Sequence, residues 1–277
     1  MTARLAGLLA LALLAPLFAA CSGPGNTIGS AEEAFARGQE AFERRRFDTA
    51  AQHFRTALDF GRTTELAVEA QFMLARAHFE NREFLIAANE YTRFLDFYRN
   101  NPRAEEAAFE RIRAYYRLSP PFELDQTDTE QALVHIRQFL QQYPQSPRVP
   151  ELVAMQEELR EKLARKQFEA GRLYERRRFF EAAVITYRGV LTDYPTSAFA
   201  DDAQLGMLRA QVGFAEASIP ARQAERFREA LAFYDRFTQL FPQSPLAREA
   251  EALYDRAFRG LRAAEAAEAS APVASGR

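Results

Sequence analysis

The side chains that could carry out catalysis are few and scattered along this chain of 277 residues. The histidines, His53, His78 and His135, lack the i, i+4 pairing and the nearby carboxylates that a metal site requires. The sequence contains one cysteine, Cys21, and it shows neither a glycine-rich phosphate loop nor a nucleophile elbow. We therefore expect no enzymatic activity and no metal or cofactor, and we expect the histidines to be partly buried helix residues.

Residue types suited to binding recur every 37 residues in the first half of the chain. The repeat consists of a first aromatic row, Phe35, Phe72 and Phe109; a second aromatic row, Phe42, Phe79 and Tyr116; and Arg76 and Arg113 between the rows. Their spacing places them along one face of a helix. This face suits an extended peptide rich in aromatic side chains, because arginine can bind a carboxylate through two parallel hydrogen bonds. The alternative is that the phenylalanines fill space between adjacent repeats and that the arginines pair with Glu69 or Glu106.

We call the two aromatic rows and the arginines between them the ladder. The elements that carry the ladder are predicted to be helical hairpins. Small residues lie on a second face of the first helix, and aromatic residues alternate with alanine in the helix that follows. The small residues are Ala34, Gly38 and Ala41, and the second-helix set Phe47, Ala50, Phe54 and Ala57 recurs as Phe84, Ala87, Tyr91 and Phe94. The small side chains let the neighbouring helix approach closely, so each repeat is expected to fold as two packed helices.

This pattern resembles the tetratricopeptide repeat. It continues as Gly171, Phe180, Ala183, Tyr187 and Val190, and two irregular units carry Ala132, Ile136 and Phe139, and Ala230, Tyr234 and Phe237. The first helices of the irregular units are expected at about 104–118 and 198–217. The resemblance implies an all-α fold, a right-handed superhelix of about five tetratricopeptide-like helical hairpins with a closing helix at roughly 246–263.

Helix boundaries are marked by proline and serine. The joints at 143–146, 194–197 and 241–244 have the pattern aromatic-Pro-x-Ser, in which proline stops one helix and serine caps the next. Pro147 and Pro245 are expected at the first position of the following helices. Ser30 and Glu33 form a capping box at the start of the first hairpin.

Two runs of arginine, 44–46 and 176–178, close predicted first helices. They suit a phosphate or a lipid headgroup, but cations also complement the negative end of a helix dipole. The sequence favours the second interpretation, because both runs lie at helix carboxyl ends.

Composition excludes nucleic acid as an expected partner. The formal net charge is −2, and removal of Arg4 with residues 1–20 would make it −2 − 1 = −3.

The apolar leader ends in Phe18-Ala19-Ala20-Cys21, which resembles the lipobox of bacterial lipoproteins. The resemblance implies cleavage before Cys21, diacylglycerol and an N-acyl chain on that cysteine, and, because Ser22 follows, sorting to the periplasmic face of the outer membrane. The alternative is ordinary signal cleavage that leaves a free thiol.

The linker Ser119–Asp128 is the most distinctive segment. Together with the lipobox and the joints it resembles the BamD family. The resemblance implies a non-enzymatic part of the outer-membrane β-barrel assembly (BAM) complex that binds unfolded outer-membrane proteins through their carboxy-terminal segments and docks on a BamA-like β-barrel subunit. Within the linker, Asp125, Gln126 and Thr127 either touch a partner or hold a rigid loop. Asp128, with Gln131 three residues later, fits the pattern of a helix cap, and this favours the rigid-loop interpretation.

The predicted organisation follows from these segments. It comprises a signal peptide, 1–20; a lipidated tether, 21–29; amino-terminal repeats that form the cargo groove, 30–145; carboxy-terminal repeats that dock the barrel subunit, 146–264; and a tail, 265–277. A periplasmic repeat adaptor similar to the Tol-Pal-associated CpoB is the rival interpretation. A lytic transglycosylase that lacks its catalytic part comes third.

Overall fold

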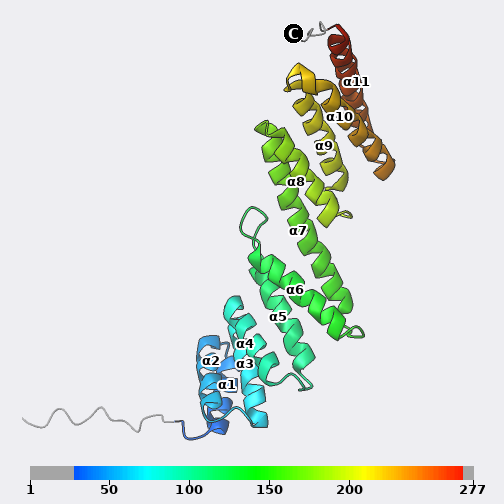
Figure 1. The fold of residues 1–277 in the computed structure, drawn as a ribbon. Helices are drawn as coiled ribbons and strands as arrows, with labels where there is room; N and C mark the ends of the chain where they lie inside the picture. The colour runs from blue at the N-terminus through cyan, green and yellow to red at the C-terminus, as the bar shows by residue number, and fades with distance from the viewer. Residues whose placement is uncertain (1–27, 271–277) are drawn as a thin grey trace, which may run out of the picture. The chain divides into compact units, whose positions relative to one another are not determined.

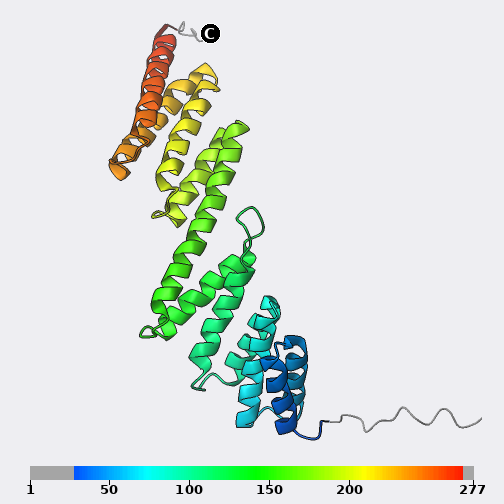
Figure 2. The same ribbon diagram turned by 180° about the vertical axis from the view of Figure 1, so that it is seen from behind.

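The computed structural model describes residues 28–270, and every regular element in this range is a helix (Figure 1). The helices are α1 (Ala31–Glu43), α2 (Phe47–Asp59), α3 (Glu65–Glu80), α4 (Phe84–Phe97), α5 (Ala104–Leu118), α6 (Thr127–Gln142), α7 (Val149–Arg176), α8 (Phe180–Asp193), α9 (Ala200–Glu216), α10 (Pro220–Leu240) and α11 (Ala247–Ser270). Consecutive helices form antiparallel pairs in both views (Figures 1 and 2). The described residues thus confirm five hairpins and a closing helix. Cys21 and the predicted signal peptide lie outside the described residues.

The chain forms two compact units, which divide between Ala107 and Ala108 inside α5. We call them unit 1 and unit 2. The predicted boundary between the amino-terminal and the carboxy-terminal repeats lies elsewhere, between residues 145 and 146. That joint does not separate compact bodies, because α7 runs on for 28 residues and packs against both α6 and α8.

Unit 1 is held together by aromatic side chains seated on small residues. Phe54 of α2 is fully buried and lies against Gly38 of α1, where an added Cβ would meet its ring at 2.7 Å. Phe35 packs against the same ring, with 5.5 Å between the ring centroids. The predicted close approach of the two helices at Gly38 is therefore confirmed.

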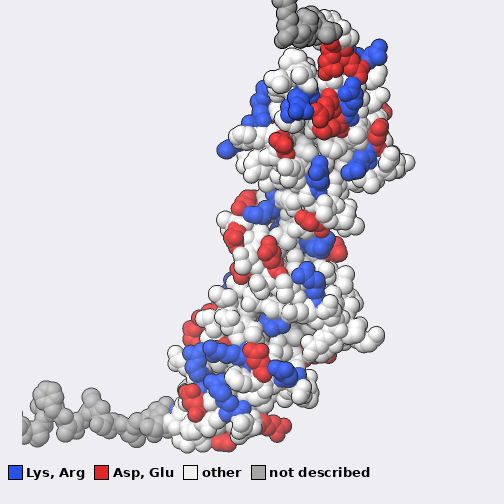
Figure 3. All heavy atoms as spheres, viewed as in Figure 1, with Lys and Arg blue, Asp and Glu red and all other residues white. Residues whose placement is uncertain are grey.

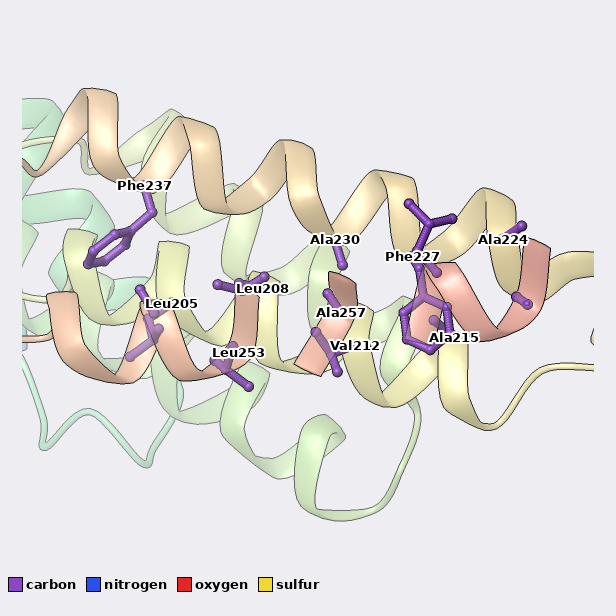
Figure 4. Close-up of a cluster of buried hydrophobic side chains, with 13 residues drawn as sticks. Leu205, Leu208, Val212, Ala215, Ala224, Phe227, Ala230, Phe237, Leu253 and Ala257 are labelled. Atoms are coloured by element: carbon purple, nitrogen blue, oxygen red, sulfur yellow. The ribbon is translucent and has the colours of Figure 1, made fainter. Parts of the chain in front are cut away.

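Unit 2 repeats this arrangement with different side chains. Tyr187 of α8 is fully buried and lies against Gly171 of α7 and Gly206 of α9. Further along, Phe227 and Phe237 of α10 pack into a cluster that α9 and α11 complete (Figure 4). The closing helix thus covers an apolar face, as predicted. It continues to Ser270, into the range 265–277 that the sequence assigns to a tail.

The observed helix caps agree in part with those predicted from the sequence. Ser30 accepts a hydrogen bond from the Glu33 backbone N–H at 3.1 Å, which confirms the cap at the start of α1. The positions expected for Pro147 and Pro245 are wrong, because α7 and α11 begin two residues later. The preceding serine at each joint caps a single turn instead: the Ser146 hydroxyl accepts from the Arg148 N–H at 3.2 Å.

The arginine runs form the turns of two hairpins. Arg45 and Arg178 have φ angles of 57° and 63°, and Arg82 has 62° in the equivalent turn after α3. At each turn the residue after this arginine donates a hydrogen bond to the carbonyl five residues back along the chain, for example from Arg46 to Ala41 at 2.8 Å. This is a Schellman motif, in which glycine usually takes the left-handed position.

No helix among residues 28–270 combines the length and the apolar character needed to cross a membrane.

Replacing Gly38 with alanine is expected to destabilise unit 1 by about 1–3 kcal/mol, because the new methyl group overlaps the buried Phe54 ring. Urea denaturation of the Gly38→Ala protein measures this loss. Gly29→Ala is the matched control, because its nearest atom is the end of the Glu33 side chain at 3.7 Å. Equal midpoints for the two variants would contradict the packing argument.

Candidate functional site

The first aromatic row of the predicted ladder lies inside the hairpins. Phe72 is 1% exposed and packs edge to face against Tyr91 and Phe94 of α4. Phe35 packs against Phe54 in unit 1, and Phe109 packs against Phe139 in unit 2, and both are buried. The geometry follows the space-filling alternative, and this row cannot form the floor of an open groove without repacking.

The second row is partly exposed. Phe42 packs edge to face against Phe47, and Phe79 against Phe84, with ring centroids 5.2 Å and 5.3 Å apart. Tyr116 donates a hydrogen bond to the Glu158 carboxylate, which is the main reason that its pKa is raised to about 12. In unit 1, Phe42 on α1 and Phe79 on α3 are partly exposed.

Arg76 of α3 is exposed, and its guanidinium lies over the Phe42 ring, 5.4 Å from the ring centroid. No carboxylate of the described residues lies within 4.0 Å of its nitrogen atoms. An arginine that rests on an aromatic face keeps its hydrogen-bond donors free while its position is restrained. Arg76 is therefore held in place and available to bind a carboxylate.

The other arginines of the ladder already hold carboxylates. Arg113 donates from Nη1 to both Glu110 oxygens, at 2.9 Å and 3.0 Å. Two further arginines on first helices of unit 2 hairpins behave alike: Arg172 of α7 pairs with Glu169, and Arg209 of α9 pairs with Glu175 and Glu249. Figure 3 shows the same mixture of cationic and anionic side chains on the face that it presents. A ligand carboxylate at Arg113 would have to displace Glu110.

The two glutamates expected to pair with the ladder arginines bind Arg103 instead. Its Nη1 atom lies 2.6 Å from both Glu69 oxygens, and its Nε atom lies 3.0 Å from Glu106. The guanidinium also covers the Phe72 ring at 3.5 Å from the centroid. This network was not predicted from the sequence. Its only sequence signal is a cation one residue before α5.

Gln126 holds the distinctive loop from inside. It is 4% exposed, its Nε2 atom donates to the backbone oxygens of Pro121 and Leu124 at 2.8 Å and 3.1 Å, and its Oε1 atom accepts from the Thr129 hydroxyl at 2.8 Å. The cap predicted at Asp128 is wrong, because α6 begins one residue earlier, at Thr127. Asp125 takes the capping role by accepting from the Thr127 N–H at 2.9 Å.

Hydrogen bonds from the Thr127 side chain and backbone N–H lower the pKa of Asp125, which is exposed. The loop thus contains one buried amide that orders it and one exposed carboxylate at its end.

The only two lysines of the chain tie this loop to α7. Lys166 donates to the backbone oxygens of Phe122 and Leu124, at 3.0 Å and 2.7 Å, and Lys162 donates to the Ser119 hydroxyl at 2.8 Å. No role was predicted for these lysines from the sequence. The signal was their rarity in a chain whose other basic side chains are nearly all arginine.

The histidines lie in three different hairpins. His78 binds the Glu83 carboxylate through Nδ1 at 2.6 Å, and this hydrogen bond lowers the pKa of Glu83. Burial lowers the pKa of His135. Within residues 28–270, no cluster of three His, Cys, Asp or Glu side chains could hold a metal ion.

The hairpins and their packing define a tetratricopeptide repeat protein. Solved structures similar to this chain include the TPR2AB domain of yeast Sti1 in complex with pHSP90, with 18% identity and a TM-score of 0.40 over 82% of this chain and 98% of that one. A TPR repeats protein from Bacteroides fragilis has 12% identity and a TM-score of 0.43 over 84% and 99%. No match was found among curated proteins.

Residues 28–226 match the YfiO family, which is described as an outer membrane lipoprotein. The chain therefore belongs to the YfiO family of outer membrane lipoproteins, and the resemblance to the BamD family is confirmed.

Replacing Gln126 with leucine should cost about 1–3 kcal/mol of unfolding free energy, because it leaves the Pro121 carbonyl and the Thr129 hydroxyl without this partner. Chemical denaturation measures the loss. Glu123→Gln, in the exposed part of the same loop, should change stability by less than about 0.5 kcal/mol. A Gln126→Leu protein as stable as this control would show that the amide does not order the loop.

Proposed function

We propose that this lipoprotein is a non-enzymatic component of the outer-membrane β-barrel assembly complex. It binds unfolded outer-membrane proteins and a BamA-like barrel subunit and promotes folding and insertion into the outer membrane. Membership of the YfiO family supports the compartment, and the tetratricopeptide hairpins support a protein-binding role. The observation that carries the cargo role is Arg76, an exposed arginine restrained on an aromatic ring and without a carboxylate partner in the described residues.

The cargo chemistry follows from the surface of α1 and α3. A peptide that ends in aromatic residues has a terminal carboxylate for the Arg76 guanidinium and apolar rings for Phe42 and Phe79. Arg113 is the weaker candidate, because Glu110 already occupies its donors. We therefore assign carboxylate recognition to Arg76, one of the two arginines that the sequence left open.

The membrane attachment is proposed to be covalent. A single acyl chain binds a membrane only marginally, whereas diacylglycerol and an N-acyl chain on Cys21 would hold the protein permanently. The protein would then face the periplasm, where unfolded outer-membrane proteins arrive.

Arg76→Glu should weaken binding of an aromatic peptide with a free terminal carboxylate roughly tenfold, because attraction becomes repulsion at the carboxylate. Fluorescence anisotropy with the purified protein measures the affinity. Arg99→Glu provides the same charge change at another exposed site in unit 1 and should leave the affinity unchanged.

Amidating the peptide terminus should cause a similar loss with the unmodified protein and no further loss with Arg76→Glu. Unchanged binding by a folded Arg76→Glu protein would exclude the assignment. Equal affinity of the amidated peptide would also exclude it.

The proposed assembly role predicts which proteins copurify with this one. Purification of the tagged protein from outer membranes in mild detergent should recover a large β-barrel subunit in stoichiometric amount, as identified by mass spectrometry. Recovery with Tol-Pal components, or of the tagged protein alone, would favour the adaptor interpretation.

A further inference from the structure

Three aromatic rings form a row along α10 and α11. The centroids of the Tyr234 and Tyr254 rings lie 4.7 Å apart, and Tyr254 and Phe258 lie 6.1 Å apart with their planes inclined by 13°. Phe258 is 46% exposed, and the two tyrosines are partly exposed. Tyr234 also packs against the apolar cluster that holds these helices together, whereas Tyr254 and Phe258 are not part of that cluster.

Arginines lie over several other accessible aromatic rings of the described residues. Arg76 covers Phe42, Arg165 covers Phe122 at 4.3 Å, and Arg226 covers Phe214 at 3.6 Å. Among the described residues, no arginine or lysine takes this place over Tyr254 or Phe258. The surface that these rings expose therefore carries no cation of the described residues, and Phe258 exposes the most of it.

Carboxylates surround the row instead. Asp235, Glu251 and Asp255 are exposed, and no cation of residues 28–270 lies within 4.0 Å of them. Burial raises the pKa of Tyr234, and the Glu251, Asp235 and Asp255 carboxylates raise it further. Other carboxylates on the same helices form ion pairs with arginines, as in Glu249–Arg209 and Glu265–Arg228.

We propose that this surface, Tyr234, Tyr254 and Phe258 with Asp235, Glu251 and Asp255, binds an arginine-bearing segment of a partner protein. Guanidinium groups stack on aromatic faces and donate two parallel hydrogen bonds to a carboxylate, so arginine can bind both the rings and the carboxylates of this surface. Lysine would satisfy the carboxylates but lacks the planar group that stacks on a ring and binds a carboxylate through two parallel hydrogen bonds. The inference rests on the proposed docking role of the carboxy-terminal repeats and gives the chemistry of the docked partner.

The test uses the full mature protein and three labelled 16-residue amphipathic helical peptides of leucine with arginine, lysine or glutamate at i, i+4 spacing. In fluorescence anisotropy the arginine peptide should bind at least tenfold more tightly than the glutamate peptide, and several-fold more tightly than the lysine peptide. The triple variant Asp235→Asn, Glu251→Gln, Asp255→Asn should bind the arginine peptide at least tenfold more weakly. Phe258→Ala should remove the preference for arginine over lysine.

A second triple variant, Glu43→Gln, Asp59→Asn, Glu80→Gln, makes the same change in net charge on exposed sites of unit 1. It should bind the arginine peptide as the unmodified protein does. Equal weakening by both triple variants would overturn the proposal, since it would show attraction to net charge only. Self-association that disappears in Phe258→Ala would also overturn it, because a second copy would then be the occupant.

The outcome is separable from the proposed function. If the α10/α11 triple variant binds the arginine peptide normally while the barrel subunit still copurifies, this inference fails and the assembly role stands. If the peptide results are as expected but no barrel subunit copurifies, the surface stands and the assembly role fails.

Discussion

Seating an aromatic ring of one helix against a glycine of its neighbour is the interaction on which the rest of this structure depends. Phe54 on Gly38 and Tyr187 on Gly171 bring paired helices close enough to bury both rings completely. Well-packed interiors tolerate little added volume, so the pairing has one arrangement. That arrangement decides which residues of a first helix point inward. In unit 1 it buries Phe35 and Phe72 and leaves Phe42, Arg76 and Phe79 accessible.

The ladder arginines show how local pairing limits function. A salt bridge on the surface contributes little to stability, but it occupies the donors that a ligand would need. Arg113, Arg172 and Arg209 have carboxylate partners from their own or neighbouring helices. Arg76 has an aromatic ring instead, so its charge is positioned without being neutralised. On α10 and α11 the opposite condition holds at Phe258, Glu251 and Asp255, which are exposed and have no cation partner among residues 28–270.

Much of the fold could be predicted from the sequence, because each hairpin repeats the same small-residue and aromatic positions. The range 104–118 for one irregular first helix agrees with α5, whose residues share a regular helical period. The candidate site was harder to predict. Phe35 and Phe42 are seven residues apart on one helix face, and periodicity alone does not show that one is buried and the other open. The partners of Glu69 and of Lys166 could not be predicted either. Many groups in the sequence could bind these side chains, and only the packing of the hairpins brings one of them close.

The central claim is that α1 and α3 receive the carboxylate end of an aromatic peptide. A crystal structure of the mature protein with such a peptide tests it most directly. The account predicts the terminal carboxylate within hydrogen-bond distance of the Arg76 guanidinium, with an aromatic side chain of the peptide against Phe42 or Phe79. A peptide bound through its carboxylate at Arg113, with Glu110 displaced and Arg76 still resting on Phe42 without a ligand, would contradict it.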